Sequence, residues 1–130
     1  MSEKITSVSR VPILITLNEG VKLEGELIKH LSPLTIKKIL INLPISQLVN
    51  NFQNKFIQVK LDLDIGVEKP LHKFKKGDIA FSSISNYICI FLTDYTHNQQ
   101  FSHIGYIKSN NLDELLKTKA GDILSIQRVN

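Results

Sequence analysis

The sequence of 130 residues contains one cysteine, no tryptophan and only two arginines. A single thiol, Cys89, cannot form a disulfide within the chain, which excludes a disulfide-stapled secreted scaffold. The longest apolar runs, such as residues 88–92, are far shorter than the ~20 residues of a membrane-spanning helix. The N-terminal residues also lack the apolar stretch of a signal peptide. These absences predict a cytoplasmic protein with no membrane partner.

The basic residues are almost all lysines, because Arg10 and Arg128 are the only arginines among the 16 basic side chains. The net charge of +4 raises the question of nucleic-acid binding. Arginine is the usual choice for bidentate contacts with bases and phosphates. Lysines gather locally only over residues 69–76. We therefore interpret the lysines as a solvated surface and keep a nucleic-acid-associated basic protein as a second alternative.

Hydrophobic alternation with a period of two dominates the chain and predicts strands. The clearest strands cover residues 11–17, 21–27, 55–63 and 87–93, and weaker ones cover 45–50, 79–81, 103–108 and 123–129. Gly20 offers a positive φ in the turn between the first two strands. Residues 94–102 are predicted to be a polar turn, and residues 65–76 a loop with room for a short strand around Val67.

Two short helices interrupt the strands. Ser32 and Pro33 have the residue types of an N-cap and a first helical position. An i, i+3, i+4, i+7 pattern of apolar residues follows from Ile36 to Leu43, and Pro44 ends it. Asn111, followed three residues later by Glu114, predicts a capping box for the second helix.

These elements predict a mainly β protein. Because full closure removes exposed sheet edges, we expect a closed or nearly closed β-barrel of about eight strands with two short helices, and a sandwich is the alternative. Residues 1–10 are polar and are expected to form a flexible N-terminus, whereas residues 11–130 form a single domain. The oligomeric state is open.

The order of motifs resembles the cyclophilin fold, and most closely the small prokaryotic cyclophilin-like proteins of unassigned function. The resemblance rests on Pro33-Leu34-Thr35 at the start of the first helix, on GDIAF followed by YICIF at residues 77–91, and on the closing segment at residues 104–123. It covers residues 11–129 and implies a cyclophilin-like β-barrel.

One departure from the cyclophilin pattern bears directly on activity. Cyclophilin isomerases place an arginine beside the substrate prolyl nitrogen, and the corresponding segment here, residues 46–52, has none. Lysine lacks the planar fork of a guanidinium group. The resemblance therefore implies a non-catalytic pocket that binds a small molecule or peptide. A weak or atypical peptidyl-prolyl isomerase is the alternative, with Gln58 or Asn50 as the donor.

No other catalytic constellation is evident. The four histidines lack zinc-binding spacing, and the chain contains no P-loop or nucleophile elbow, so we expect no metal and no cofactor. Cys89 lies inside an apolar strand and is expected to be a buried, inert thiol. The predicted pocket residues are Asn50, Phe56, Gln58, Phe81, Asn86 and Phe91.

Overall fold

The structure is a computed structural model and describes residues 9–129. These residues form nine strands, one α-helix and one 3₁₀-helix. In chain order the elements are β1 (Arg10–Leu17), β2 (Val21–Ile28), α2 (Pro33–Asn42), β3 (Ile45–Phe52), β4 (Phe56–Lys60), β5 (Pro70–Phe74), β6 (Asp78–Ser82), β7 (Tyr87–Phe91), β8 (Tyr95–Ile107), η1 (Leu112–Lys117) and β9 (Ile123–Arg128). The predicted flexible N-terminus therefore lies outside the described residues up to residue 8, and Arg10 already belongs to β1.

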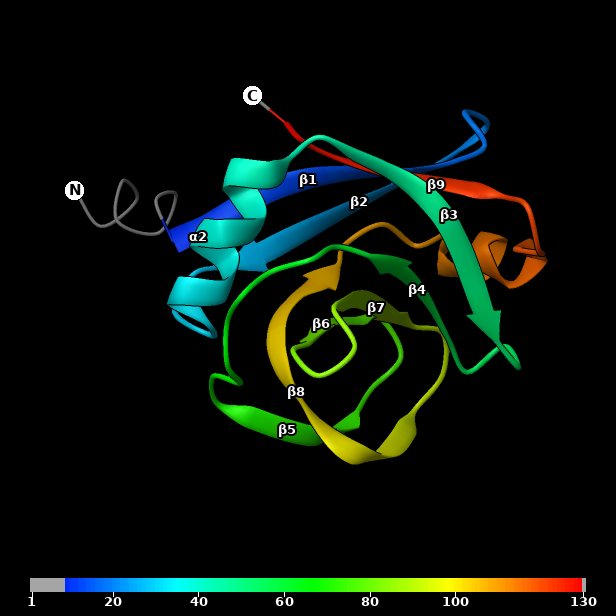
Figure 1. The fold of residues 1–130 in the computed structure, drawn as a ribbon. Coiled ribbons are helices and arrows are strands. Elements are labelled where there is room, and N and C mark those ends of the chain that lie inside the picture. The colour runs from blue at the N-terminus through cyan, green and yellow to red at the C-terminus, as the bar shows by residue number, and fades with distance from the viewer. Residues whose placement is uncertain (1–8, 130) are drawn as a thin grey trace.

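Eight of the strands form a closed ring. Their order is β2-β1-β9-β3-β4-β7-β6-β8, and a further pairing of β2 with β8 closes it (Figure 1). Each described pairing is antiparallel, and β5 is added to β8 outside the ring. This arrangement confirms the predicted closed, mainly β architecture of about eight strands with two short helices.

The ring closes at two glycines. Gly105 of β8 faces Leu27 of β2, and a Cβ atom built on Gly105 would lie only 1.9 Å from the carbonyl oxygen of Glu26. Gly25 is also tight, because its Cβ would lie 3.1 Å from the carbonyl oxygen of Tyr106. Only a residue without a side chain allows the backbones to approach this closely at position 105. Gly105 is therefore required for the closure of the ring.

Strand β8 also contains a bulge beside this glycine. Its pairing with β6 shifts between Ile79, which faces Gly105, and Ala80, which faces His103. The extra residue, Ile104, bends the strand, as bulges do. Figure 1 shows β8 curving around the lower part of the ring to reach both β5 and β2.

The main hydrophobic core lies inside the ring. Alternate residues of each strand point inward, as with Ile13 and Ile15 of β1 and Ile57 and Val59 of β4. Helix α2 contributes Ile36 and Ile39 to the same core. Each fully buried aliphatic side chain contributes about 1.5–3 kcal/mol relative to an exposed one. The predicted inward face of residues 57–63 is confirmed, although β4 itself ends at Lys60.

A distant carboxylate caps the start of α2. The backbone carbonyl of Ser32 accepts the first helical hydrogen bond from Ile36 at 2.9 Å, but the Ser32 side chain makes no cap. Instead, Glu68 accepts hydrogen bonds from the backbone N–H groups of Leu34 and Thr35 at 3.2 and 2.7 Å. Desolvation alone would raise the pKa of Glu68, but these hydrogen bonds hold it below its ordinary value. The predicted start of the helix is right, and its capping group was missed.

Two Gly-Asp turns have the same geometry. In each turn the aspartate N–H donates to a lysine carbonyl three residues earlier, and the lysine N–H donates to the aspartate side chain at 2.9 Å. Gly77 and Gly121 have φ angles of 95° and 93°, which side-chain-bearing residues rarely adopt. The aspartates are Asp78 and Asp122. The repeated motif therefore builds the same loop before β6 and before β9.

Several local predictions were wrong. Residues 95–102 are not a polar turn but the first part of β8, where alternate positions are half-buried. The strand expected around Val67 lies at residues 70–74 as β5. In the first hairpin the positive φ angles belong to Asn18 and Glu19, at 52° and 67°, rather than to Gly20.

The predicted capping box of the second helix does not form. The Asn111 side chain donates to the carbonyl of Lys22 and caps no helical N–H, and the helix it precedes, η1, is a 3₁₀-helix. No helix within residues 9–129 has the length and apolar character needed to cross a membrane.

Candidate ligand-binding face

The outer face of β3, β4 and β7 brings four of the six predicted pocket residues together. Asn50 faces Gln58 across β3 and β4, and Phe56 faces Phe91 across β4 and β7. The rings of Phe56 and Phe91 have centroids 5.3 Å apart. Gln58 in turn lies beside Cys89, whose Sγ is 3.9 Å from the Gln58 Oε1 atom. The strand pairings therefore place these four side chains on the same outer face of the sheet.

The other two predicted residues lie elsewhere. Phe81 points to the inside of the ring and is fully buried in the main core. Asn86 lies in the β6–β7 turn with a φ of 61°, and its backbone and side-chain oxygens accept hydrogen bonds from Leu61 and Leu63. Asn86 thus anchors the segment after β4, and neither residue reaches the outer face of β4.

Side chains of the same chain cover the two phenylalanines on this face. Phe74 of β5 stacks on Phe91 with ring centroids 4.2 Å apart, and Tyr95 and His97 of β8 pack against Phe56 at 5.6 and 6.0 Å. Phe56 and Phe91 are only 3% and 0% exposed. We call this set of rings, with Phe101, the aromatic face. It is packed internally and leaves no open surface over Phe56 or Phe91.

Burial favours the neutral forms of two titratable groups at the aromatic face, His97 and Cys89. Burial lowers the pKa of His97, against a hydrogen bond with Asn98 that raises it. Burial also raises the pKa of the Cys89 thiol, which stays protonated. The expected buried, inert cysteine is confirmed as buried.

An open hollow lies next to the β3–β4 hairpin. It has a volume of about 420 Å³ and lies between residues 49–54 and the segment that follows η1. Its lining, which we call the amide hollow, consists of Val49, Asn50, Asn51, Gln53, Asn54, Thr118, Lys119 and Ala120. Of the predicted pocket residues only Asn50 belongs to it. The amide-rich run at residues 50–54 is the sequence signal that could have identified the rest.

Two of the amides hold the hollow in shape. Asn51 donates from Nδ2 to Asn54 Oδ1 at 2.9 Å and to the carbonyl of Thr118 at 3.0 Å. Its Oδ1 accepts the backbone N–H of Asn54 at 2.8 Å. Gln53 and Asn54 both have positive φ angles, 52° and 60°, in the hairpin loop. These bonds fix the hairpin against residue 118.

Three further polar side chains line the hollow. Within residues 9–129, the side chains of Asn50, Gln53 and Lys119 form no hydrogen bond or ion pair, and the nearby charge that acts on Lys119 is that of Asp122. Thr118 is 5% exposed, and its Oγ1 atom is buried without a hydrogen-bond partner in the described chain. A buried hydroxyl without a partner costs about 1–3 kcal/mol. The hollow therefore combines a rigid frame with unused donors and acceptors.

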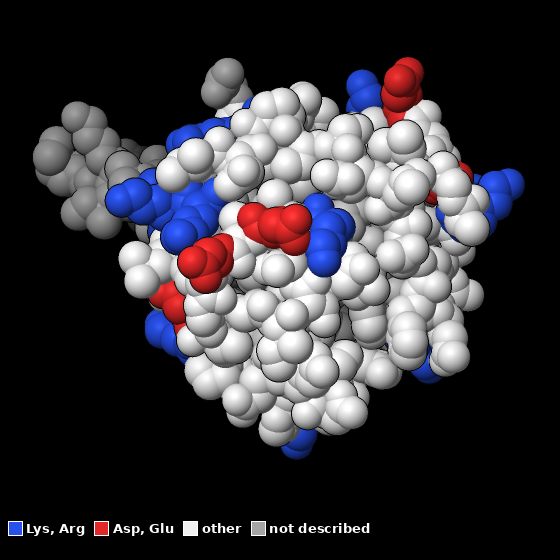
Figure 2. Space-filling view, viewed as in Figure 1, with Lys and Arg blue, Asp and Glu red and all other residues white. Residues whose placement is uncertain are grey.

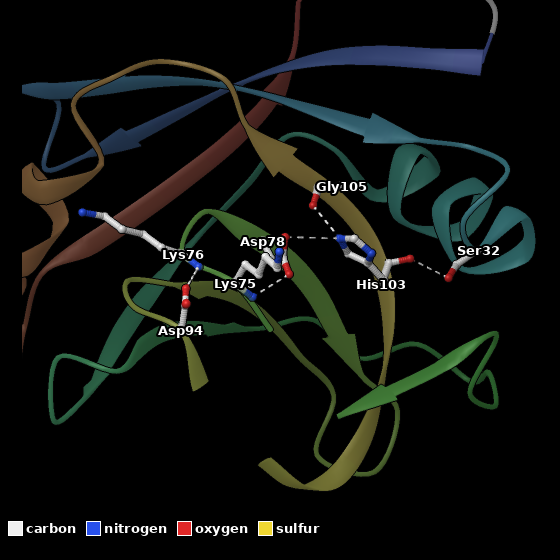
Figure 3. A network of polar contacts seen from close by, with 7 residues as sticks. All are labelled: Ser32, Lys75, Lys76, Asp78, Asp94, His103 and Gly105. Carbon is white, nitrogen blue, oxygen red and sulfur yellow. Dashed lines mark hydrogen bonds and ion pairs between the residues drawn. The ribbon is translucent and has the colours of Figure 1, made fainter. Parts of the chain in front are cut away.

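A second polar cluster joins β6, β8 and the start of α2 (Figure 3). The Asp78 Oδ1 atom lies 3.6 Å from His103 Nε2, which is also 3.1 Å from the carbonyl of Gly105. Since both neighbours are acceptors, Nε2 carries the proton. Ser32 Oγ donates to the backbone carbonyl of His103 at 2.7 Å and does not reach the imidazole ring.

The contacts of this cluster stabilise the fold. Burial lowers the pKa of His103 in spite of the nearby Asp78 carboxylate and the Gly105 carbonyl, so the imidazole is neutral at pH 7. Because the Ser32 hydroxyl is already used by a backbone carbonyl, the three side chains do not form a nucleophilic triad. The cluster fixes the β8 bulge next to α2. No group of three or more His, Cys, Asp or Glu side chains within residues 9–129 is placed to hold a metal ion.

The lysine cluster of residues 69–76 surrounds β5, the strand added outside the ring. Lys69 Nζ donates to the carbonyl of His30, and Lys76 Nζ forms an ion pair with Asp113 at 3.0 Å. Lysines and a proline on such a strand discourage edge-to-edge association. Protection of this added strand is a structural role for these lysines that does not require nucleic acid.

The ring of eight antiparallel strands, with α2 packed on its core, defines the class to which the chain is assigned. The model of the cyclophilin-like family matches residues 11–127, and the chain belongs to this family. The resemblance inferred from the sequence motifs is confirmed.

Two solved structures share the fold. The solution structure of a hypothetical protein from Archaeoglobus fulgidus has a TM-score of 0.78 and 20% identity, covering 93% of this chain and 96% of that one. The structure of McbB in complex with tryptophan has a TM-score of 0.73 and 14% identity, covering 89% of this chain and 44% of McbB. At these identities the likeness shows the fold alone. No protein with a curated description matches the chain by sequence.

Proposed function

We propose that this protein is a non-catalytic binding module and that it holds a peptide or small molecule in the amide hollow. The observation that carries the proposal is the set of unused polar groups on a rigid frame: Asn50, Gln53 and Lys119 at the hollow and the buried Thr118 hydroxyl. Ligand sites typically place a few convergent polar groups in a concave surface of this size.

The chemistry of the hollow favours a ligand with amide and carboxylate groups. A primary amide side chain offers two donors and one carbonyl acceptor, which match the N–H and C=O of a peptide group. The Lys119 ammonium group is a point charge suited to a carboxylate. A peptide with a free C-terminus presents both groups. An amino acid such as the tryptophan bound to McbB presents the carboxylate together with an ammonium group, which can donate to an amide oxygen.

The positions of the two arginines support binding without catalysis. Arg10 pairs with Glu26 at 3.0 Å at the start of β1, and Arg128 lies at the end of β9. Neither belongs to β3, β4 or β7. A prolyl peptide on this side of the ring therefore finds no guanidinium group to weaken its amide resonance, behind a barrier of about 18–20 kcal/mol.

The proposal is tested by titrating ¹⁵N-labelled protein with acetyl-Ala-Ala-Pro-Ala carrying a free carboxylate, and separately with tryptophan. We expect saturable amide shifts at residues 50–54 and 118–120 with at least one of these probes. Asn50→Ala should weaken binding about tenfold, the value of one hydrogen bond. Gln127→Ala removes an exposed amide on β9 and is the matched control.

Two results would overturn the proposal. One is the absence of saturable shifts in the amide hollow with both probes. The other is an equal loss of affinity in Asn50→Ala and Gln127→Ala, because the binding would then not depend on the hollow.

A further inference from the structure

A second concave surface runs along α2, on a different part of the molecule from the amide hollow. It has a volume of about 470 Å³ and a floor of aliphatic side chains, which are Pro33, Ile36, Leu40 and Ile41. Their positions i, i+3, i+7 and i+8 lie on one stripe of the helix. From Pro33 to Ile41 the stripe is about 12 Å long at 1.5 Å per residue. Ile36 is fully buried beneath the stripe, whereas Ile41 is 74% exposed and leaves its apolar surface in contact with water.

Three cations border this floor. Lys29, Lys37 and Arg128 line the groove, and none of them forms an ion pair or side-chain hydrogen bond with residues 9–129. Figure 2 shows lysine and arginine side chains gathered over the region of α2 on the left of the view. The groove is thus apolar at its base and positive along its border.

The nearby acidic residues contact other positions of the helix. Glu68 accepts the backbone N–H groups of Leu34 and Thr35, and the backbone carbonyl of Asp64 accepts a hydrogen bond from Lys38. None of positions 34, 35 and 38 lines the groove, and Lys37 forms no ion pair within residues 9–129.

The apolar floor of the groove favours an alkyl chain as its ligand. Pro33, Ile36, Leu40 and Ile41 carry no side-chain donors or acceptors, so an extended peptide would find no partner for its backbone groups on this floor. An alkyl chain needs no such partner. The aliphatic stems of Lys29 and Lys37 extend the apolar surface while their ammonium groups stay at the border.

We infer that the α2 groove binds a free single-chain fatty carboxylate, with the alkyl chain on the aliphatic floor and the carboxylate between Lys37 and Arg128. This site is independent of the peptide or small molecule proposed for the amide hollow. Its ligand differs in chemistry, and its residues are not shared with the hollow.

The test uses the full chain and sodium decanoate below its micelle-forming concentration. We expect saturable NMR shifts of the Ile36, Leu40 and Ile41 methyl groups. Decanol, which has the same chain without the charge, should bind about tenfold more weakly, since a charge-assisted contact is worth about 1.5–3 kcal/mol.

Matched substitutions separate the groove from general effects. Lys37→Glu should weaken decanoate binding about tenfold or more because it reverses one charge at the border. Lys38→Glu, one residue away and off the stripe, should leave the affinity unchanged. Ile41→Gln should also weaken binding, whereas Ile84→Gln, at a similarly exposed isoleucine in the β6–β7 turn, should not.

Three outcomes would overturn the inference. The first is the absence of saturable methyl shifts with decanoate, and the second is equal binding of decanol and decanoate. The third is co-sedimentation with anionic phospholipid vesicles without binding of free decanoate, which would assign the groove to a membrane surface. Shifts at residues 50–54 in the peptide titration are unaffected by any of these results, so the two proposals can fail separately.

Discussion

Two regions next to the β3–β4 hairpin differ in how they are packed, and we call them the closed side and the open side. On the closed side, Phe56 and Phe91 are covered by rings from β5 and β8. On the open side, at residues 49–54, the amide hollow contains polar groups that form no hydrogen bond within the described chain. The sites differ in chemistry although they share a hairpin.

Unused polar groups, rather than aromatic side chains, indicate a binding site in this chain. Aromatic side chains in a family position are satisfied equally by a ligand or by neighbouring rings, and here neighbouring rings supply the contacts. A buried hydroxyl or amide without a hydrogen-bond partner lowers the free energy of unfolding until a ligand supplies a partner. Unused hydrogen-bonding capacity therefore distinguishes the open side from the closed side.

The largest predicted effect concerns the closed side. Phe91→Ala should lower the free energy of unfolding by about 3–5 kcal/mol, because it removes a fully buried ring and leaves a cavity. Urea denaturation measures this loss, and the folded fraction should still bind the peptide probe at residues 50–54. A loss of peptide affinity with little loss of stability would show that Phe91 belongs to a binding surface.

The next effect separates the frame of the hollow from its free groups. Asn51→Ala removes three hydrogen bonds and should lower the free energy of unfolding by about 1–3 kcal/mol. Asn50→Ala, at the adjacent position, should change it by less than about 0.5 kcal/mol. Thermal denaturation of both variants checks this order. Equal destabilisation would contradict the assignment of Asn50 as a free group.

A smaller effect of opposite sign is predicted at Thr118. Thr118→Val replaces a buried hydroxyl that lacks a partner and should raise the free energy of unfolding by about 1 kcal/mol. Thr16→Val, on a half-buried position of β1, is the matched control. If Thr118→Val is instead destabilising, the hydroxyl is already satisfied within the free protein.

The smallest effect is a difference in pH dependence. Burial lowers the folded-state pKa values of His97 and His103 below 6.5, so the unfolded chain binds protons more readily. The free energy of unfolding should therefore be highest above pH 6.5 and fall as the pH decreases through 6.5 towards the folded-state pKa values. His97→Gln should reduce this slope.

The amide hollow should not follow the same profile. The polar side chains that line it are amides, a hydroxyl and a lysine, and neither a histidine nor a carboxylate is among them. Peptide affinity per folded molecule should stay constant between pH 7.5 and about 6, above the carboxylate range. A parallel fall in affinity would link the hollow to the histidines of the closed side.

Much of the fold could be predicted from alternation because burial imposes it. The inward face of β4, at Ile57 and Val59, is correct since a single-residue shift would expose it to water. The helix beginning at Pro33 is also correct. These features depend on local sequence.

Other features depend on contacts between distant residues and were missed. Glu68 caps α2 from 33 and 34 residues away, a distance along the chain that no capping motif covers. The first part of β8 is polar, and it forms a strand because its half-buried side carries Tyr95, His97 and Phe101 against the aromatic face. Phe81 was assigned to the pocket because a short strand does not reveal which of its faces points inward.

The candidate site was only partly predictable for the same reason. Asn50 was identified from its position in the family resemblance, but the hollow needs Thr118 and Lys119, which come from the segment after η1. Their contact with residues 50–54 follows from the pairing of β3 with β9. The spacing of these segments in the sequence does not predict that pairing.

The most direct test of the account is the cis–trans exchange rate of acetyl-Ala-Ala-Pro-Ala, measured by exchange NMR with stoichiometric protein while the protein amide signals are recorded. We predict exchange at the uncatalysed rate, over tens to hundreds of seconds, together with amide shifts at residues 50–54 and 118–120. Accelerated exchange, or shifts confined to β4 and β7, would contradict a non-catalytic module that binds through the amide hollow.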